Sequence, residues 1–272
     1  MSVKAEVICD SISPVGHRLI TVQTHAPKFL DAELRTHRML SQNSSSDRAI
    51  PVSTNQEMFT PTDVRRAGKG MQNDQPVSVD VLADFTVTHK HLFNSALLAA
   101  LSFKDVIHKQ HLNRWLLPFS FQDKVITGNI EWWEYFLSLR DTDAADPAMT
   151  QLAGCIRDAI QGSVPRPVAY FEWHLPYVLP TEVEIFSSSK CALLSAARCA
   201  RISYMKHGTT KVDDVIDVGF AKRLISDRHL TPFEHQAYPG SCSSEPGITA
   251  VRLDGEPLSG NFHGWIQHRQ VI

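Results

Sequence analysis

The stretch Thr36–Arg48 reads T-H-R-M-L-S-Q-N-S-S-S-D-R and gathers many hydrogen-bonding side chains in a short space. Apolar residues near helical spacing precede it, which predicts a helix over residues 28–40 that runs into a polar loop at 41–48. Arginine presents a planar fork of donors that matches phosphate, and hydroxyls and amides complete such a site without adding charge. Residue types alone favour two interpretations equally. The stretch is either an anion or nucleotide site or a solvated loop with helix-capping serines.

The composition indicates a globular protein whose surface is not basic. The 272 residues are 43% hydrophobic and 21% charged, which suits one large domain or two small ones and excludes disorder as the main state. The 27 Lys+Arg against 29 Asp+Glu leave a net charge of −2, so we expect no nucleic-acid partner. No apolar run approaches the roughly 20 residues that cross a bilayer, and Met1–Asp10 shows no secretion signal. We therefore expect no membrane partner and a cytoplasmic location.

The five cysteines are odd in number, widely spaced and without a C-x-x-C pair. This pattern predicts free thiols rather than a disulfide framework or a structural zinc site. His108 and His111 stand three residues apart, but no carboxylate or thiol accompanies them at helical spacing. We therefore expect no metal.

Hydrophobic periodicity predicts strands near the N-terminus and several helices after them. Residues 1–26 alternate apolar and polar in short runs, which suits strands at the rim of a sheet. Residues 80–113 carry the longest helical stripe, and we expect this helix to pack in the core. Further helices are predicted over residues 131–140, 148–160, 191–200 and 212–226, the second of them bounded by Asp146-Pro147 and Gly162. A long surface loop is predicted over residues 52–78, and an irregular stretch over 165–180.

The order of the polar residues in the opening stretch resembles the signature of the flavin-dependent thymidylate synthases, the ThyX family, written R-H-R-x-x-S-x-N-E-x-S-x-R. Six positions match it: His37, Arg38, Ser41, Asn43, Ser46 and Arg48. Two positions depart from it, because Thr36 replaces the first Arg and Ser44 replaces the Glu.

Two further motifs follow the signature. The segment Asn113–Pro118, N-R-W-L-L-P, is similar to the family's R-x-x-L-P, whose Arg holds the nucleotide. The segment Asn129–Arg140, N-I-E-W-W-E-Y-F-L-S-L-R, is similar to a family helix that begins N-x-R and ends F-L-x-L-R. Glu131 stands where that helix usually has an Arg.

The fourth motif is out of order. Residues 224–235, L-I-S-D-R-H-L-T-P-F-E-H, resemble the family's G-H-x-[ST]-P-F-E-H, and residues 197–204 resemble the A-R-V-S-Y before it. Both precede the signature in most members, so the chain resembles a circularly permuted, phage-type branch, in which case the location is the host cytoplasm. The closing residues 264–269 fit that branch as well. Circular permutation is tolerated where chain termini lie close together at the surface.

The resemblance spans residues 27–48, 112–160 and 193–239. Together with the predicted elements it implies an α/β (α+β) fold of ThyX type, in which a sheet packs with long helices. We expect a single catalytic domain over residues 1–272, with a signature loop at 36–48, a helical region at 80–162 and the late motifs at 193–239.

The resemblance also implies an activity: the reductive methylation of dUMP to dTMP with methylene tetrahydrofolate and NADPH, through FAD. It places three arginines on the nucleotide, Arg48, Arg114 and Arg140, and Ser46 against the pyrimidine as the catalytic position. An unassisted hydroxyl needs a neighbouring base to act as a nucleophile, so we expect Ser46 to position or polarise the substrate. The flavin candidates are His37, Arg38, Asn43, Asn129, His229 and Thr231, with Glu234 orienting them.

Some of these residues have simpler interpretations when taken alone. Arg140, near Glu134 and Asp141, is typical of a surface ion pair. Trp132, Trp133 and Phe136 are typical of a core.

Two alternatives to thymidylate synthesis stay open. The first is a hydroxymethylase that uses the same flavin and folate on a pyrimidine nucleotide, because the departures at Thr36, Ser44 and Glu131 fall near the reacting centre. The second is a flavin- or nucleotide-binding protein without catalysis. Family members are homotetramers whose active sites draw residues from several subunits, and the resemblance implies the same assembly here.

Overall fold

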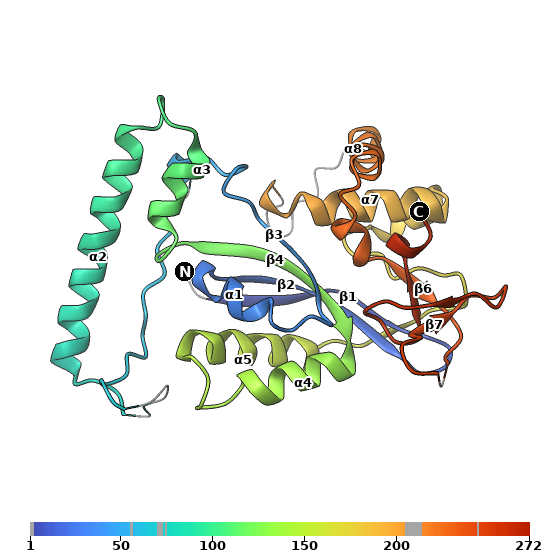
Figure 1. Cartoon of the computed structure of the whole chain (residues 1–272), viewed down its shortest axis with the longest axis horizontal. Coiled ribbons are helices and arrows are strands. Elements are labelled where there is room, and N and C mark those ends of the chain that lie inside the picture. Colours follow the sequence, from blue (N-terminus) through green and yellow to red (C-terminus); the bar gives the residue numbers. More distant parts are fainter. Residues whose placement is uncertain (1–2, 55–56, 70–72, 74, 205–213, 244) are drawn as a thin grey trace.

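A five-stranded sheet forms the middle of the molecule in the computed structural model, which describes residues 3–54, 57–69, 73, 75–204, 214–243 and 245–272 (Figure 1). Its strand order is β3-β4-β2-β1-β5, and every neighbouring pair is antiparallel except β1 with β5. The strands are β1 (Lys4–Ile12), β2 (Arg18–Pro27), β3 (Ser41–Ser44), β4 (Phe121–Asn129) and β5 (Arg166–Pro167).

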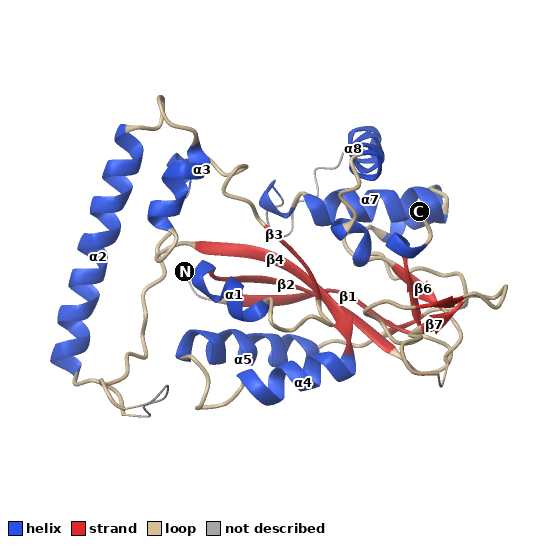
Figure 2. Cartoon of the chain, viewed as in Figure 1, coloured by secondary structure: helices blue, strands red, loops and turns tan. Residues whose placement is uncertain are grey.

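Helices cover both faces of this sheet (Figure 2). On one face lie α4 (Ile130–Arg140) and α5 (Pro147–Gln161), and on the other lie α7 (Ser188–Ala200) and α8 (Asp214–Ser226). The largest apolar cluster joins Ile20 and Ile126 of the sheet to Trp133, Phe136 and Ile156 of α4 and α5. The predicted α/β class, with a sheet packed against helices, is confirmed.

The prediction that the N-terminal strands lie at the rim is wrong for β2, which is the central strand. Its residues 19–24 are all buried, and two of the polar ones, Thr21 and Gln23, have hydrogen-bond partners. Thr21 Oγ1 bonds Thr127 Oγ1 at 2.7 Å, and Gln23 Oε1 accepts a bond from the Tyr177 hydroxyl at 2.8 Å. Alternation in the sequence suggests one exposed face, but hydrogen bonds across the sheet let polar residues be buried on both faces.

The region before and within the signature also differs from the prediction. The expected helix over 28–40 shortens to a 3₁₀ turn, η1 (Lys28–Leu30), and one helical turn, α1 (Asp31–Leu34). The expected loop 36–48 contains the edge strand β3, which pairs with β4. Polar side chains suit an edge strand, because one side of its backbone has no strand partner.

The four shorter predicted helices are confirmed within a few residues as α4, α5, α7 and α8, although positions 212 and 213 lie outside the described residues. Asp146 caps α5 by accepting bonds from the backbone N–H of Ala148 and Met149, and Pro147 occupies the first turn. The stretch 165–180, predicted to be irregular, contains the two residues of β5 and ends where α6 (Pro180–Ile185) begins.

The longest predicted helix ends early and does not pack in the core. It divides into α2 (Val79–Ser102), a turn, α3 (Lys109–Leu112) and the 3₁₀ segment η3 (Asn113–Leu116). On α2 only Phe93 and Ala100 are buried, and they join Leu112 and Leu116 in a separate cluster. Figure 1 shows α2 beside α3 and apart from the sheet. The predicted helical region 80–162 is interrupted by β4 as well.

The C-terminal part consists of short strands beside the sheet. β6 (Ala237–Pro239) pairs with β9 (Trp265–Gln267), and β7 (Ala250–Val251) pairs with β8 (Pro257–Leu258). The remaining 3₁₀ segments are η2 (Val52–Thr54), η4 (Ile202–Tyr204), η5 (Thr231–Glu234) and η6 (His268–Gln270).

Two side chains from this end hold the late motif against the signature. Gln267 Nε2 donates to the backbone oxygen of Glu234 at 2.8 Å, and Asn261 Nδ2 donates to Ser41 Oγ at 3.0 Å. The tertiary structure thus brings η5 beside β3, although the two segments are far apart in the chain. Among the described residues, none of the helices combines the length and apolar character that a bilayer span requires.

Candidate functional site

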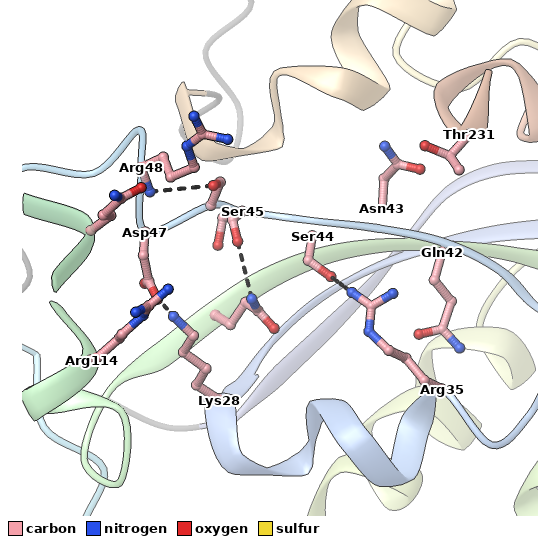
Figure 3. Close-up of a pocket in the computed structure, with 13 residues that line it drawn as sticks. Lys28, Arg35, Gln42, Asn43, Ser44, Ser45, Asp47, Arg48, Arg114 and Thr231 are labelled. Atoms are coloured by element: carbon pink, nitrogen blue, oxygen red, sulfur yellow. Dashed lines mark hydrogen bonds and ion pairs between the residues drawn. The ribbon is translucent and has the colours of Figure 1, made fainter. Parts of the chain in front are cut away.

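A cationic cavity of about 460 Å³ lies where the end of the signature meets η3 and η5 (Figure 3). That volume is in the range of small-molecule sites. It brings together five predicted site residues from three motifs, Asn43, Ser46, Arg48, Arg114 and Thr231. The other residues that line it are Lys28, Arg35, Gln42, Ser44, Ser45, Asp47, Gln110 and Gln122.

Two arginines in this cavity are free to bind a ligand. Asp47, the only carboxylate in the lining, forms an ion pair with Lys28. Arg35 bonds Asp31 and Ser44. In the described part of the chain, the guanidinium groups of Arg48 and Arg114 have no hydrogen-bond or ion-pair partner. The cavity therefore offers two unpaired cations to an anion.

The loop that carries Arg48 is held in place through its backbone. Asn113 Nδ2 donates to the carbonyl oxygens of Asp47 and Ile50 at 3.1 and 2.9 Å, and Lys109 Nζ donates to that of Ala49 at 2.6 Å. Because Asn113 and Lys109 precede Arg114 by only a few residues, these bonds hold the second motif against the first.

Ser46 is exposed at the rim of the cavity. Its Oγ accepts a bond from the backbone N–H of Arg48 at 3.3 Å, and its own N–H donates to Ser203 Oγ at 2.9 Å. Within the described chain, the hydroxyl bonds no histidine or carboxylate that could deprotonate it. The geometry therefore favours a positioning role over a nucleophilic one.

Asn43 is anchored by a buried chain of hydrogen bonds that the sequence did not reveal. Its Oδ1 lies 3.3 Å from His235 Nε2, and His235 Nδ1 lies 2.8 Å from Thr127 Oγ1. Thr127 bonds Thr21, which bonds His174 Nε2 at 2.8 Å. Figure 3 shows Asn43 and Thr231 facing one another on one side of the cavity, and Arg48 and Arg114 on the opposite side.

The two histidines in this chain of hydrogen bonds, His174 and His235, are neutral. Burial lowers the pKa of His235 to about 3, and burial together with the charge of Arg166 lowers the pKa of His174 to about 3. A neutral His235 satisfies its two partners by donating from Nε2 to Asn43 and accepting at Nδ1 from Thr127. The amide N–H groups of Asn43 then remain available to a ligand.

A second cavity of about 290 Å³ collects the other part of the signature. Its lining comprises Thr36, His37, Arg38, Met39, Leu40, Trp132, Tyr135, Leu139 and Arg140. Arg140 Nε donates to His37 Nε2 at 3.0 Å, and Arg140 also pairs with Glu33. Burial and the adjacent Arg140 charge lower the pKa of His37, so its imidazole accepts this bond in the neutral form.

Arg140 therefore lies apart from the two other arginines predicted to bind the nucleotide. Its ion pair is with Glu33, not with Glu134 or Asp141, the neighbours considered from the sequence. The aromatic prediction is confirmed for Trp133 and Phe136, which are fully buried, whereas Trp132 is only partly buried and lines the second cavity.

Three predicted flavin residues line neither cavity. Asn129 is buried and bonds both backbone groups of His263, donating to its carbonyl at 3.0 Å and accepting from its N–H at 2.8 Å. Glu234 pairs with Arg269, and His229 is an exposed residue after α8.

Several lining residues were not predicted, because they stand outside the family motifs. Lys28 and Arg35 belong to the segment before the signature, where a helix was predicted without a role for its cations. Gln110 and Gln122 come from α3 and β4, whose positions the local pattern did not reveal. His235 stood in the quoted P-F-E-H motif, and that was the one signal that could have identified it.

Comparison with known proteins identifies both the fold and the family. None of the curated proteins matches the chain. A solved structure of the UMP/dUMP methylase PolB from Streptomyces cacaoi, bound with 5-Br UMP, has a similar fold, with a TM-score of 0.52 and 18% identity over 59% of this chain and 89% of its own. A second PolB structure, bound with 5-Br dUMP, aligns at a TM-score of 0.48 and 17% identity, over 58% and 88% of the two chains.

The family match rests on sequence and covers more than half of the chain. It extends from residue 9 to 166, so it includes the end of β1, all of β2 and the signature but not the late motifs at 193–239. The chain belongs to the family described as thymidylate synthase complementing protein, which confirms the resemblance found in its motifs.

Proposed function

We propose that this protein is a thymidylate synthase that binds dUMP in the 460 Å³ cavity and methylates its pyrimidine ring. The observation that carries the proposal is the pair of guanidinium groups of Arg48 and Arg114, which have no partner among the described residues and lie beside Ser46 of the family signature. Membership of the thymidylate synthase complementing family supports it, as does the fold shared with a protein named as a UMP/dUMP methylase.

The cavity offers groups for both ends of a mononucleotide. Arg48 and Arg114 neutralise the phosphate dianion and hold it by charge-assisted hydrogen bonds. Gln122 lines the same cavity, and its Oε1 is buried without a hydrogen-bond partner in the described chain. A uracil N3–H is a donor that would satisfy this oxygen once a rotation of the side chain turns it into the cavity, since a buried acceptor left unpaired is costly. The Asn43 amide, which His235 orients, supplies donors for the carbonyl oxygens of the ring.

The second cavity is our proposed flavin site. Arg38 and Arg140 there fit a pyrophosphate, and the Trp132 and Tyr135 rings fit the face of an aromatic ring system. Asn129 does not fit the flavin, because both ends of its amide already bond the backbone of His263. When bound, FAD would supply the hydride transfer that links NADPH to the one-carbon unit of methylene tetrahydrofolate. The chain's own residues would hold the nucleotide in the first cavity and the flavin in the second.

The separation of the two cavities supports a homotetramer with shared sites. On one chain, Arg140 and His37 do not line the cavity that contains Arg48 and Arg114. A neighbouring subunit would have to bring its second cavity, and the flavin proposed there, to the nucleotide of the first cavity. In addition, α2 exposes apolar side chains that a monomer leaves in water. These are Val79, Val81, Phe85, Val87, Leu92 and Leu98.

The experiment is tritium release from [5-³H]dUMP by the purified protein with FAD, NADPH and methylene tetrahydrofolate, followed by mass spectrometry of the product. The proposal expects tritium release and a methylated nucleotide. A hydroxymethyl product would instead establish the alternative suggested by Thr36 and Ser44. Binding of dUMP and FAD without release would identify a non-catalytic homologue. Failure to bind either ligand would overturn the assignment of both cavities.

A further inference from the structure

Three side chains that play no part in the proposed reaction converge near the outer end of the β1–β2 hairpin. They are His17, Cys242 and His263, and their possible ligand atoms all lie within 4.8 Å of one another. His17 Nε2 is 2.9 Å from Cys242 Sγ, and the two imidazole rings are 4.8 Å apart at an interplanar angle of 87°. None of the three lines either cavity described above.

The backbone holds the two histidines firmly in place. Both backbone groups of His263 bond the buried side chain of Asn129, at 2.8 and 3.0 Å. Gly264 adopts a φ of +77°, and a Cβ there would lie 2.4 Å from His17 Cδ2, so only glycine lets the loop approach this ring. The backbone of Gly240, near Cys242, donates to the Gly264 oxygen at 3.0 Å.

We propose that His17, Cys242 and His263 bind one divalent metal ion of borderline softness, with Zn²⁺ as the preferred ion. Imidazole nitrogen and thiolate sulfur are the ligand types that zinc selects. Tetrahedral zinc, with bonds of about 2.0–2.1 Å to nitrogen and about 2.3 Å to sulfur, sets ligand atoms roughly 3.3–3.6 Å apart. Side-chain rotations that move the ligand atoms by about 1 Å would bring the three atoms to these separations.

The surroundings suit a cation with one open coordination position. Glu131 at the start of α4 carries a negative charge that acts on His17. Glu131 is also the residue that departs from the family's N-x-R motif, so a negative charge replaces a positive one beside this cluster. A bound Zn²⁺ with one thiolate carries a net positive charge, which this carboxylate offsets. Cys242 is exposed, which leaves the ion a path of entry.

The ion would add a direct link between segments that lie far apart in the chain. Cys242 is 225 residues from His17 in the chain, and the strands on either side of it, β6 and β7, have only three and two residues. The metal would therefore act as a cross-link for this short-stranded end of the molecule. The sequence alone predicts no metal, because a metal site is recognised there by ligands at short, regular spacing. This cluster shows no such spacing, since its three ligands come from distant segments of the chain.

The test is metal binding by the full-length, tag-free, reduced protein. Equilibrium dialysis should give one Zn²⁺ per chain, and Co²⁺ should produce visible d–d bands together with a near-ultraviolet thiolate-to-cobalt band. Cys242→Ser should abolish the thiolate band, and His17→Ala or His263→Ala should prevent binding of the ion. Two matched controls, Cys155→Ser and His91→Ala, change a thiol and a histidine elsewhere and should bind Co²⁺ as the unaltered protein does.

A thermal readout separates loss of the site from loss of the fold. Because Cys242 is exposed, metal-free Cys242→Ser should unfold at the same temperature as the metal-free parent. Zn²⁺ should raise the unfolding temperature of the parent and of Cys155→Ser, but not that of Cys242→Ser. Absence of stoichiometric binding, or an unchanged cobalt spectrum in Cys242→Ser, would overturn the proposal.

Discussion

His235 Nε2 lies 3.3 Å from Asn43 Oδ1 across a sequence separation of 192 residues. This contact joins the late motif to the signature, as the permuted arrangement predicted from the sequence requires. Circular permutation changes where the chain begins, but it need not change which segments pack together. The contact also places a buried polar chain directly behind the proposed nucleotide cavity.

The Thr127 hydroxyl connects this chain of hydrogen bonds to the sheet, because it bonds both Thr21 and His235 Nδ1. We expect Thr127→Val, which keeps the shape of the side chain, to lower the free energy of unfolding by about 1–3 kcal/mol, because a buried imidazole nitrogen loses its partner. Urea denaturation measures this change. Thr62→Val, at an exposed site, should stay within about 0.5 kcal/mol of the parent. Equal stabilities for the two variants would contradict the buried chain.

Arg114→Ala should weaken dUMP binding by about 10- to 150-fold, because a charge-assisted contact contributes about 1.5–3 kcal/mol. Isothermal titration calorimetry measures the dissociation constant, and the absorbance of bound flavin should stay unchanged. Arg252→Ala removes a cation that pairs with Asp254 and Glu256 outside the cavity, and it should bind dUMP normally. If Arg114→Ala lost flavin binding while it still bound dUMP normally, the assignment of the two cavities would be reversed.

Stability should fall as the pH decreases below about 6.5. The native pKa is about 3 for His174 and His235 and about 4 for His268, whereas unfolded histidine titrates near 6.5. Between these values the unfolded state binds more protons, so each group lowers the free energy of unfolding by about 1.4 kcal/mol per pH unit of acidification. His268 Nδ1 has no hydrogen-bond partner in the described chain, so His268→Phe is a mild substitution.

That variant should therefore show a pH slope smaller by about 1.4 kcal/mol per unit between pH 4 and 6. Urea titrations at several pH values measure it. His91→Ala, at an exposed position on α2, should keep the parental slope. An unchanged slope in His268→Phe would mean that this imidazole is not buried in the neutral form.

Arg198 is 2% exposed and binds Glu182 through two nitrogens at 2.6 Å, the Tyr177 carbonyl at 2.6 Å and Asp217 at 3.4 Å. It thereby holds α6, α7 and α8 together. We expect Arg198→Ala to lower the free energy of unfolding by about 3–5 kcal/mol, because Glu182 would be left without its cation, while Asp217 keeps its ion pair with Arg201. Arg157→Ala removes an exposed ion pair and should lower the free energy of unfolding by no more than about 1 kcal/mol. Urea denaturation measures both changes.

The sequence predicts elements well where the signal is local. The start of α5 follows from Asp146 and Pro147, because capping involves residues within one turn of one another. The same logic fails for β2, whose central position depends on β1 and β4 as neighbours. It fails also for α2, whose apolar stripe packs against α3 and η3 rather than against the sheet.

By itself, the sequence determined the family of this protein. The order of His37, Asn43, Ser46 and Arg48 was enough to indicate the family that the comparison confirms. Only the tertiary structure decided which of these residues share a cavity: it grouped Arg48 with Arg114 and placed Arg140 with His37. It also brought His17, Cys242 and His263 together. The physical reason is that residue type and spacing are local properties, whereas contacts between distant segments are set by the packing and hydrogen bonding of the whole chain.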